Sequence, residues 1–109
     1  MQQTVIKNAT IINENNRFVG DVLLEGEFIK LISTSIEPTE NTKVIDATGL
    51  YLIPGFIDDQ VHFREPGLTH KATIATESKA AVAGGITTFI EMPNTVPQAT
   101  TQSLLEEKF

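Results

Sequence analysis

The feature that most restricts the fold of this chain is the order of patterns in its second half. Residues 56–63 form an apolar, partly β-branched run, residues 71–83 carry Ala, Glu, Lys and Ile at helical spacing, and residues 86–92 form a second such run. Because parallel strands need a crossover connection, usually a helix, this order predicts a parallel sheet. Ser103 and Glu106 resemble a capping box and predict one more helix at the end.

The first half of the chain has a different pattern. Short runs rich in β-branched and apolar residues are separated by turn formers, which predicts strands at residues 4–13, 21–25, 28–33 and 43–46. Strands this short and this closely spaced predict a small, antiparallel, sandwich-like sheet. The pattern changes at Pro54-Gly55. We therefore predict a small β domain over residues 1–53 and an α/β domain over residues 54–109.

The α/β part is short for a closed fold. A parallel sheet must be covered on both faces, and a (β/α)8 barrel takes about 250 residues. Two predicted strands and a helix that is only starting at the end of 109 residues therefore indicate the first βα units of a longer protein.

Composition excludes several classes of function. Eight basic residues against fourteen acidic ones, with no basic cluster, argue against nucleic acid and anionic membranes as partners. The absence of cysteine leaves only nitrogen and oxygen ligands for a metal. The N-terminus lacks the pattern of a signal peptide, and the apolar stretch at residues 49–57 is too short to span a bilayer. A soluble, cytoplasmic protein is the expectation.

Four polar residues follow one another at every second position of the run at residues 56–63 and just beyond it. They are Asp58, Gln60, His62 and Arg64. On a regular strand they share one face, while Val61 and Phe63 point to the other. Polar side chains on a buried strand need a metal, a ligand or an ion pair. The structural alternative is an Asp58–Arg64 ion pair beside a hydrogen-bonded core histidine.

Residues 58–67 resemble the motif Asp-x-His-x-His-x-Arg-Glu-Pro-Gly of the dihydroorotases, which belong to the amidohydrolase superfamily. A second block, residues 77–95, resembles the same family and ends in Met92-Pro93-Asn94-Thr95. The two motifs occur in the family's order and spacing. The resemblance implies a small β domain followed by the start of a (β/α)8 metallo-dependent hydrolase barrel, incomplete in this chain.

The resemblance also implies a chemistry, namely the reversible, zinc-dependent conversion between dihydroorotate and N-carbamoyl-aspartate in pyrimidine biosynthesis. It implies that His62 is a zinc ligand in contact with the substrate, and that Arg64 and Asn94 hold the substrate carboxylate. One or two zinc ions are expected. Their remaining ligands and the catalytic residues would lie beyond residue 109, so this segment alone should be inactive. Implied partners are the small-molecule substrate, and a second copy of the chain or aspartate transcarbamoylase.

The motif is broken at Gln60, which stands where the family has its first histidine ligand. A neutral amide can ligate only through its carbonyl oxygen, which makes Gln60 a doubtful metal ligand. Two alternatives stay open: a non-catalytic, dihydroorotase-like scaffold, and another cyclic amidohydrolase of the hydantoinase or allantoinase type. Arg64 and Asn94 favour a dihydroorotase, because a carboxylate clamp is of no use to a scaffold or to an enzyme whose substrate lacks that group.

Overall fold

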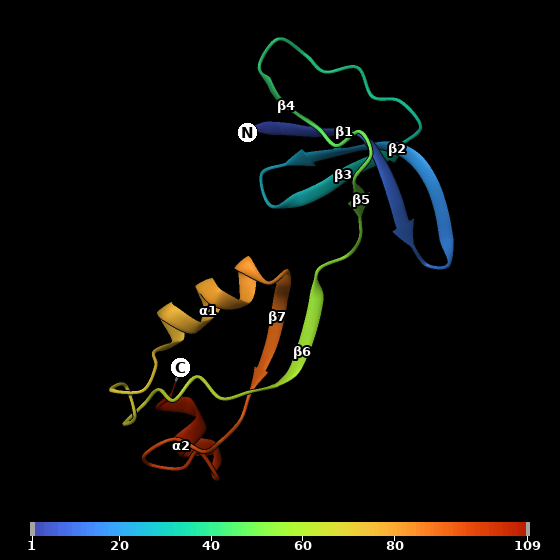
Figure 1. Cartoon of the computed structure of the whole chain (residues 1–109). Helices are drawn as coiled ribbons and strands as arrows, with labels where there is room; N and C mark the ends of the chain where they lie inside the picture. The colour runs from blue at the N-terminus through green and yellow to red at the C-terminus, as the bar shows by residue number, and fades with distance from the viewer. Residues whose placement is uncertain (1, 109) are drawn as a thin grey trace. The chain divides into compact units, whose positions relative to one another are not determined.

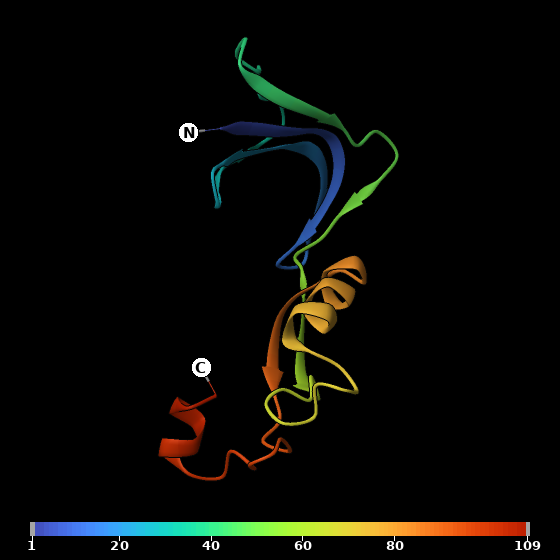
Figure 2. The same cartoon turned by 90° about the vertical axis from the view of Figure 1, so that its left-hand side faces the viewer.

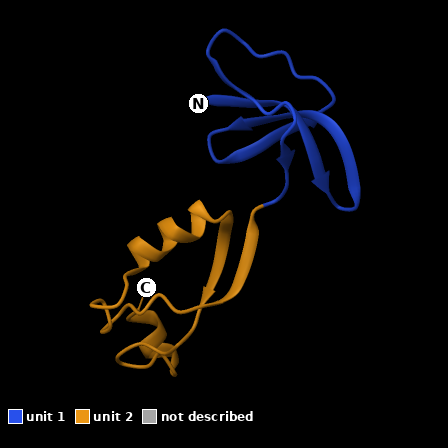
Figure 3. Cartoon of the chain, in the orientation of Figure 1, with its two compact units in different colours: residues 1–54 blue, residues 55–109 orange. Residues whose placement is uncertain are grey.

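The computed structural model describes residues 2–108, and the chain divides into two compact units, Met1–Pro54 and Gly55–Phe109 (Figure 3). Strands make up the first unit, and the second contains strands and helices (Figure 1). In chain order the elements are β1 (Gln3–Asn13), β2 (Asn16–Glu25), β3 (Phe28–Ser33), β4 (Thr42–Asp46), β5 (Tyr51–Leu52), β6 (Phe56–Val61), α1 (Ile74–Ala83), β7 (Ile86–Glu91) and α2 (Gln102–Glu106).

The strands of the first unit form one mixed sheet in the order β3-β2-β1-β4, with β5 also paired to β1. The pairs β1–β2 and β2–β3 are antiparallel, as hairpins must be. The prediction of an antiparallel sheet is wrong for β4 and β5, which both pair with β1 in parallel. The reason is the long segment between β3 and β4, which brings the chain back to the start of β1 without a helix.

The beginning of β2 and the presence of β5 also differ from the prediction. β2 begins at Asn16 because the turn before it needs only Glu14 and Asn15, which have φ angles of +48° and +63°. Both residues occupy the left-handed region that matches the twist of a tight hairpin. β5 was not predicted, because two residues are too few to show a period.

A buried carboxylate holds the first unit together. The side chain of Asp21 is 2% exposed and accepts backbone hydrogen bonds from Asn8 and Ile36, each at 2.8 Å. Lys7 Nζ lies 2.7 Å from Asp21 Oδ2, the oxygen that also accepts the Ile36 amide. The hydrogen bond from Lys7 is the main reason why the pKa of Asp21 lies below its usual value, against the opposing effect of burial. Asp21 thus fixes the bulge of β1 at Asn8, beside a small core of Ala9, Ile11, Val22 and Ala47.

The second unit confirms the strand, helix, strand order. β6 and β7 pair in parallel, and α1 connects them and lies alongside β7 (Figures 1 and 2). α1 begins at Ile74, three residues later than predicted, because Thr73 is its N-cap and forms a capping box with Thr76. The helix ends at Ala83 with Gly84 as its C-cap, and Gly85 takes a φ of +87°.

The last helix starts earlier than the capping box at Ser103 predicted. The Thr101 side chain accepts the Leu104 amide at 3.3 Å, so Thr101 is the N-cap of α2. No helix within residues 2–108 is both long enough and apolar enough to cross a membrane.

Candidate functional site

The carboxyl ends of β6 and β7 bring two predicted site residues together. His62 follows β6 directly, and Asn94 follows β7 by three residues. The parallel register places Val61 opposite Glu91, and the Met92 amide donates to the Val61 carbonyl at 2.9 Å. Beyond that last bond of the ladder, His62 Nδ1 lies 2.9 Å from Asn94 Oδ1.

The contact between His62 and Asn94 determines which nitrogen of the imidazole carries the proton. A carboxamide oxygen can only accept a hydrogen bond, so Nδ1 of His62 must be the donor. In a neutral imidazole this leaves Nε2 with a free lone pair. His62 is exposed, and a histidine in this state can bind a metal or a ligand through Nε2.

Arg64 lies two residues beyond His62, in a turn that changes the direction of the chain. Its φ is +70°, and its carbonyl accepts the Leu68 amide at 3.0 Å. The Glu65 carboxylate accepts the amide of Ile74, the first residue of α1, at 2.8 Å. This bond anchors the turn to the positive end of the helix. Arg64 is half-buried, and its backbone follows the same strand end as His62.

The loops after β6 and β7 contact each other closely. The Val96 amide donates to the Pro66 carbonyl at 3.1 Å. Gly67 has a φ of +80°, and a Cβ placed there would lie 2.1 Å from the Val96 carbonyl oxygen, so only glycine fits. Thr95 is 2% exposed and its Oγ1 donates to the Pro97 carbonyl at 2.8 Å. The loop that carries Asn94 is therefore closed on itself and on its neighbour.

Asp58 and Gln60 do not share one strand face with His62 and Arg64, as they would on a regular strand. One extra residue of β6 lies between the register positions Asp58 and Val61, which interrupts the two-residue alternation. The backbone N–H of Gln60 donates to Asp58 Oδ1 at 3.1 Å, and the Gln60 side chain is exposed. The alternative Asp58–Arg64 ion pair does not form among the described residues.

Metal ligands are sparse in this part of the chain. Within residues 2–108, no three His, Cys, Asp or Glu side chains come together in a way that could hold a metal ion. His62 has the tautomer that a metal ligand needs, and Gln60 has a carboxamide oxygen exposed to solvent. The described residues thus fit a metal as one imidazole ligand, and not as a complete site.

Sequence reasoning missed two charged residues beside the site. The Glu91 carboxylate, at the end of β7, accepts the Phe63 amide at 3.1 Å and forms an ion pair with Lys108. Burial lowers the pKa of Lys108. The only signal of this pair in the sequence is the acidic residue that ends the apolar run at residues 86–92.

Side chains gathered beyond the carboxyl ends of parallel strands define a class of α/β proteins that bind ligands at that edge. Within that class the chain belongs to the dihydro-orotase-like family, whose model matches residues 49–107, more than half of the chain.

Curated relatives agree with that family. A dihydroorotase of Lactobacillus helveticus (strain DPC 4571) is 46% identical over 105 residues, which cover 96% of this chain and 24% of the relative. A dihydroorotase of Staphylococcus aureus (strain Mu50 / ATCC 700699) is 45% identical over 93 residues, 85% of this chain and 22% of the relative. The chain therefore spans about a quarter of the length of these relatives.

Solved structures of hydantoinases resemble the chain. The L-hydantoinase (dihydropyrimidinase) from Arthrobacter aurescens has a TM-score of 0.89 at 32% identity and covers 99% of this chain and 24% of its own. The D-hydantoinase (dihydropyrimidinase) from Thermus sp. has a TM-score of 0.68 at 44% identity over 83% of this chain and 20% of its own. The sheet-rich fold of this chain is thus that of one part of a cyclic amidohydrolase.

Proposed function

We propose that this chain is the substrate-clamping part of a cytoplasmic dihydroorotase, which interconverts dihydroorotate and N-carbamoyl-aspartate in pyrimidine biosynthesis. The observation that carries the proposal is the 2.9 Å contact between His62 and Asn94 beyond the ends of two parallel strands. It joins the two motifs of the family in one place. The dihydroorotases that are 45% and 46% identical support the same substrate.

The same proposal extends to the architecture. Residues 1–53 would be the small β domain, and residues 54–109 the first βα units of a (β/α)8 barrel. The parallel β6-α1-β7 unit supports this, because it is the repeating unit of such a barrel. In barrel enzymes the active site lies at the carboxyl ends of the strands, which is where His62, Arg64 and Asn94 lie.

In the proposed clamp, Arg64 and Asn94 bind the carboxylate of dihydroorotate. A guanidinium presents a planar pair of N–H donors that matches a carboxylate, and an amide NH2 adds a neutral donor. The Asn94 oxygen is already bonded to His62, which leaves the Asn94 NH2 group for the substrate. One asparagine thereby links the histidine to the carboxylate and sets the distance between them.

His62 would bind zinc through Nε2, the nitrogen that the Asn94 contact leaves unprotonated. When bound, zinc supplies Lewis acidity toward the ring carbonyl and lowers the pKa of a bound water. This segment binds and orients the ring, and the remaining ligands and proton-transfer groups would come from the rest of the enzyme. Hydrolysis breaks the ring amide C–N bond, adding the water oxygen to the carbonyl carbon and a proton to the nitrogen.

The clamp can be tested with Arg64→Ala and Asn94→Ala in the full-length protein. Each variant should lose about 1.5 to 3 kcal/mol of apparent binding energy for dihydroorotate, because each removes a hydrogen bond to a charged group. Steady-state kinetics on dihydroorotate measures this loss. Lys71→Ala and Gln98→Ala are matched controls, since both side chains are exposed in nearby loops.

The same assay separates the alternatives. Unchanged kinetics in both clamp variants would contradict the carboxylate assignment, and turnover of hydantoin in preference to dihydroorotate would identify a hydantoinase instead. A folded full-length protein that turns over neither ring would point to the non-catalytic scaffold, for example one that binds aspartate transcarbamoylase.

A further inference from the structure

The Glu91 carboxylate is hydrogen-bonded to the backbone amide of Phe63, which lies between the proposed site residues His62 and Arg64. The ladder between β6 and β7 finishes with the bond from the Met92 amide to the Val61 carbonyl, at 2.9 Å. Two residues after Val61, the backbone amide of Phe63 donates to Glu91 Oε1 at 3.1 Å. A side chain thus continues the pairing after the backbone of β7 has stopped.

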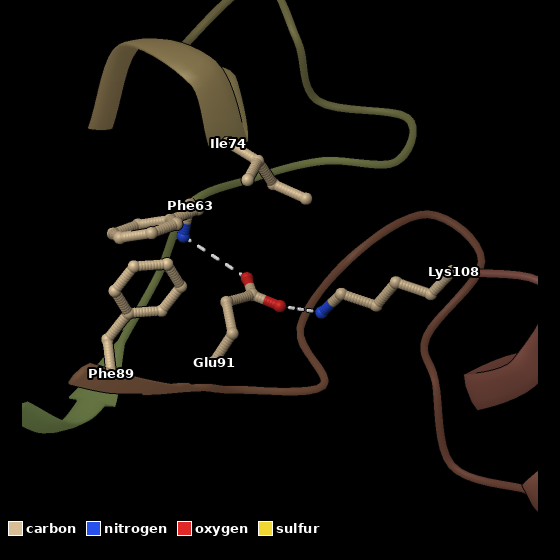
Figure 4. A pocket seen from close by; sticks show the side chains of 5 residues that line it. All are labelled: Phe63, Ile74, Phe89, Glu91 and Lys108. Atoms are coloured by element: carbon tan, nitrogen blue, oxygen red, sulfur yellow. Dashed lines mark hydrogen bonds and ion pairs between the residues drawn. The ribbon is translucent and has the colours of Figure 1, made fainter. Parts of the chain in front are cut away.

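The second oxygen of Glu91 is held by Lys108, which forms an ion pair with it (Figure 4). The Glu91 side chain is 10% exposed and that of Lys108 only 4%. Lys108 Nζ also donates to the Met92 carbonyl at 3.3 Å. The pair borders a cavity of about 120 Å3 whose other walls are Phe63, Ile74 and Phe89, as Figure 4 shows.

These apolar surroundings make the orientation of the carboxylate definite. Charged hydrogen bonds are stronger where water is excluded, and a nearly buried carboxylate that has lost its partners is costly. Phe63 is itself fixed by its ring contact with Phe89, at a centroid distance of 4.5 Å. Glu91 is therefore held through both of its oxygens, and in this position it accepts the Phe63 amide.

The segment needs such a support, because its own backbone does not supply one. β6 ends at Val61, and Arg64 has a φ of +70°, a region that residues other than glycine rarely adopt. A non-glycine residue stays there only when its surroundings hold it.

We propose that Glu91, held by Lys108, is a positioning residue: by binding the Phe63 amide it fixes the backbone that presents His62 and Arg64 to the substrate. This role rests on the proposed function for its effect on kinetics. Its effect on the backbone is independent of that function. Glu91 touches neither the substrate nor a reacting atom, and acts only through the peptide that it binds.

Two double variants of the full-length protein isolate the hydrogen bond. Glu91→Gln with Lys108→Met removes both charges and keeps an oxygen that can accept the Phe63 amide. Glu91→Leu with Lys108→Met removes the same charges and the acceptor as well. Glu107→Leu, at an exposed position of the same C-terminal segment as Lys108, is the surface control.

Two measurements are needed. In hydrogen–deuterium exchange, the Leu variant should exchange its 62–64 segment about tenfold faster than the Gln variant, whose exchange should stay close to wild type. With dihydroorotate, the Leu variant should raise KM about tenfold over the Gln variant. A purely structural role would lower the folded fraction of both variants and leave the KM of the folded molecules unchanged.

Equal exchange and equal KM in the two variants would overturn the positioning role while leaving a dihydroorotase intact. If the wild-type protein did not turn over dihydroorotate, the proposed function would fail, and the exchange comparison alone would decide about Glu91. If the Leu variant did not fold, rapid exchange of the 62–64 segment in the folded Gln variant would overturn the role, and wild-type protection there would support it.

Discussion

Gln60 is the residue at which this chain departs from its family's motif, and its surroundings do not compensate for the change. The Gln60 side chain is exposed, and the nearby Asp58 carboxylate accepts a hydrogen bond from the backbone N–H of Gln60. A metal at this strand end would therefore have His62 as its only imidazole ligand from β6. An amide oxygen is a weaker donor to zinc than an imidazole nitrogen.

We expect Gln60→His to raise the metal content of the full-length protein from about one toward about two ions per chain, because it adds a nitrogen donor two residues from His62. His62→Ala should lower metal affinity and abolish turnover. Metal analysis after dialysis against a weak chelator measures the metal content of both variants, and steady-state kinetics measures their turnover. The wild-type protein can be active with one zinc, because a single ion can activate water and polarise a carbonyl.

Gln98→His is the control for this experiment, since it adds an exposed histidine elsewhere in the same unit. Two tightly held ions in the wild-type protein would contradict the expectation. They would show that Gln60 is an adequate ligand, or that another group replaces it.

At the scale of elements, the contact between the two strand-end loops depends on Gly67. Alanine there would face two obstacles, a φ of +80° and a Cβ at 2.1 Å from the Val96 carbonyl oxygen. Gly85 has a φ of +87° with nothing within 4 Å of such a Cβ, so it offers the same backbone strain without the collision.

We expect Gly67→Ala to destabilise the full-length protein by at least about 2 kcal/mol, because backbone strain alone costs of order 1–3 kcal/mol and the Val96 peptide must also move. Gly85→Ala should cost less, by the strain alone. Chemical denaturation compares the two variants. Equal losses would mean that the loops yield without cost, and that their contact does not hold the Asn94 loop in place.

The elements also show what the sequence could and could not predict. The strand, helix, strand order followed from β-branched runs bounded by glycine and proline, and the parallel pairing of the two strands followed from the helix between them. The resemblance named His62 and Asn94 as site residues, but the hydrogen bond between them was not predicted. The extra residue of β6 between Asp58 and Val61 had no signature in the alternation, so the expected common face was only partly right. Bulges are set by pairing with the neighbouring strand, which a single strand's pattern does not contain.

Pairings between distant residues were harder to predict. Lys108 meets Glu91 only because the chain after β7 turns back, and nothing in the spacing of the two residues indicates it. The buried Asp21 is a similar case, since its partners Lys7, Asn8 and Ile36 lie on both sides of it in the sequence. The parallel pairing of β1 with β4 was missed because a connection without a helix gives no periodic signal.

At the scale of the whole molecule, much apolar surface is open to solvent. Phe28 and Ile29 of β3 are 72% and 66% exposed, and Phe56 and Ile57 of β6 are 60% and 69% exposed. No side chain of α1 is buried. Within residues 2–108, the β6–β7 sheet has no further strand on either edge. Open edges and contiguous apolar faces of this kind promote aggregation.

We therefore expect the 109-residue chain by itself to be poorly soluble and to have no hydrolase activity. Size-exclusion chromatography and amide exchange on the isolated chain measure this, with the full-length protein as the control. A compact monomer with well-protected amides would contradict the expectation, and would show that the two units complete their own cores.

The joined strand-end loops also restrict how this sequence can vary in length. His62 is bonded to Asn94, and the Val96 amide to the Pro66 carbonyl, so both loops are fastened near their beginning and again a few residues later. Inserting or deleting a residue between these points in one loop would shift its hydrogen-bonding groups away from their partners in the other loop. Insertions between homologues should therefore accumulate at exposed positions outside the fastened stretches, such as Thr69 to Lys71 before α1, where the added length can loop out into solvent.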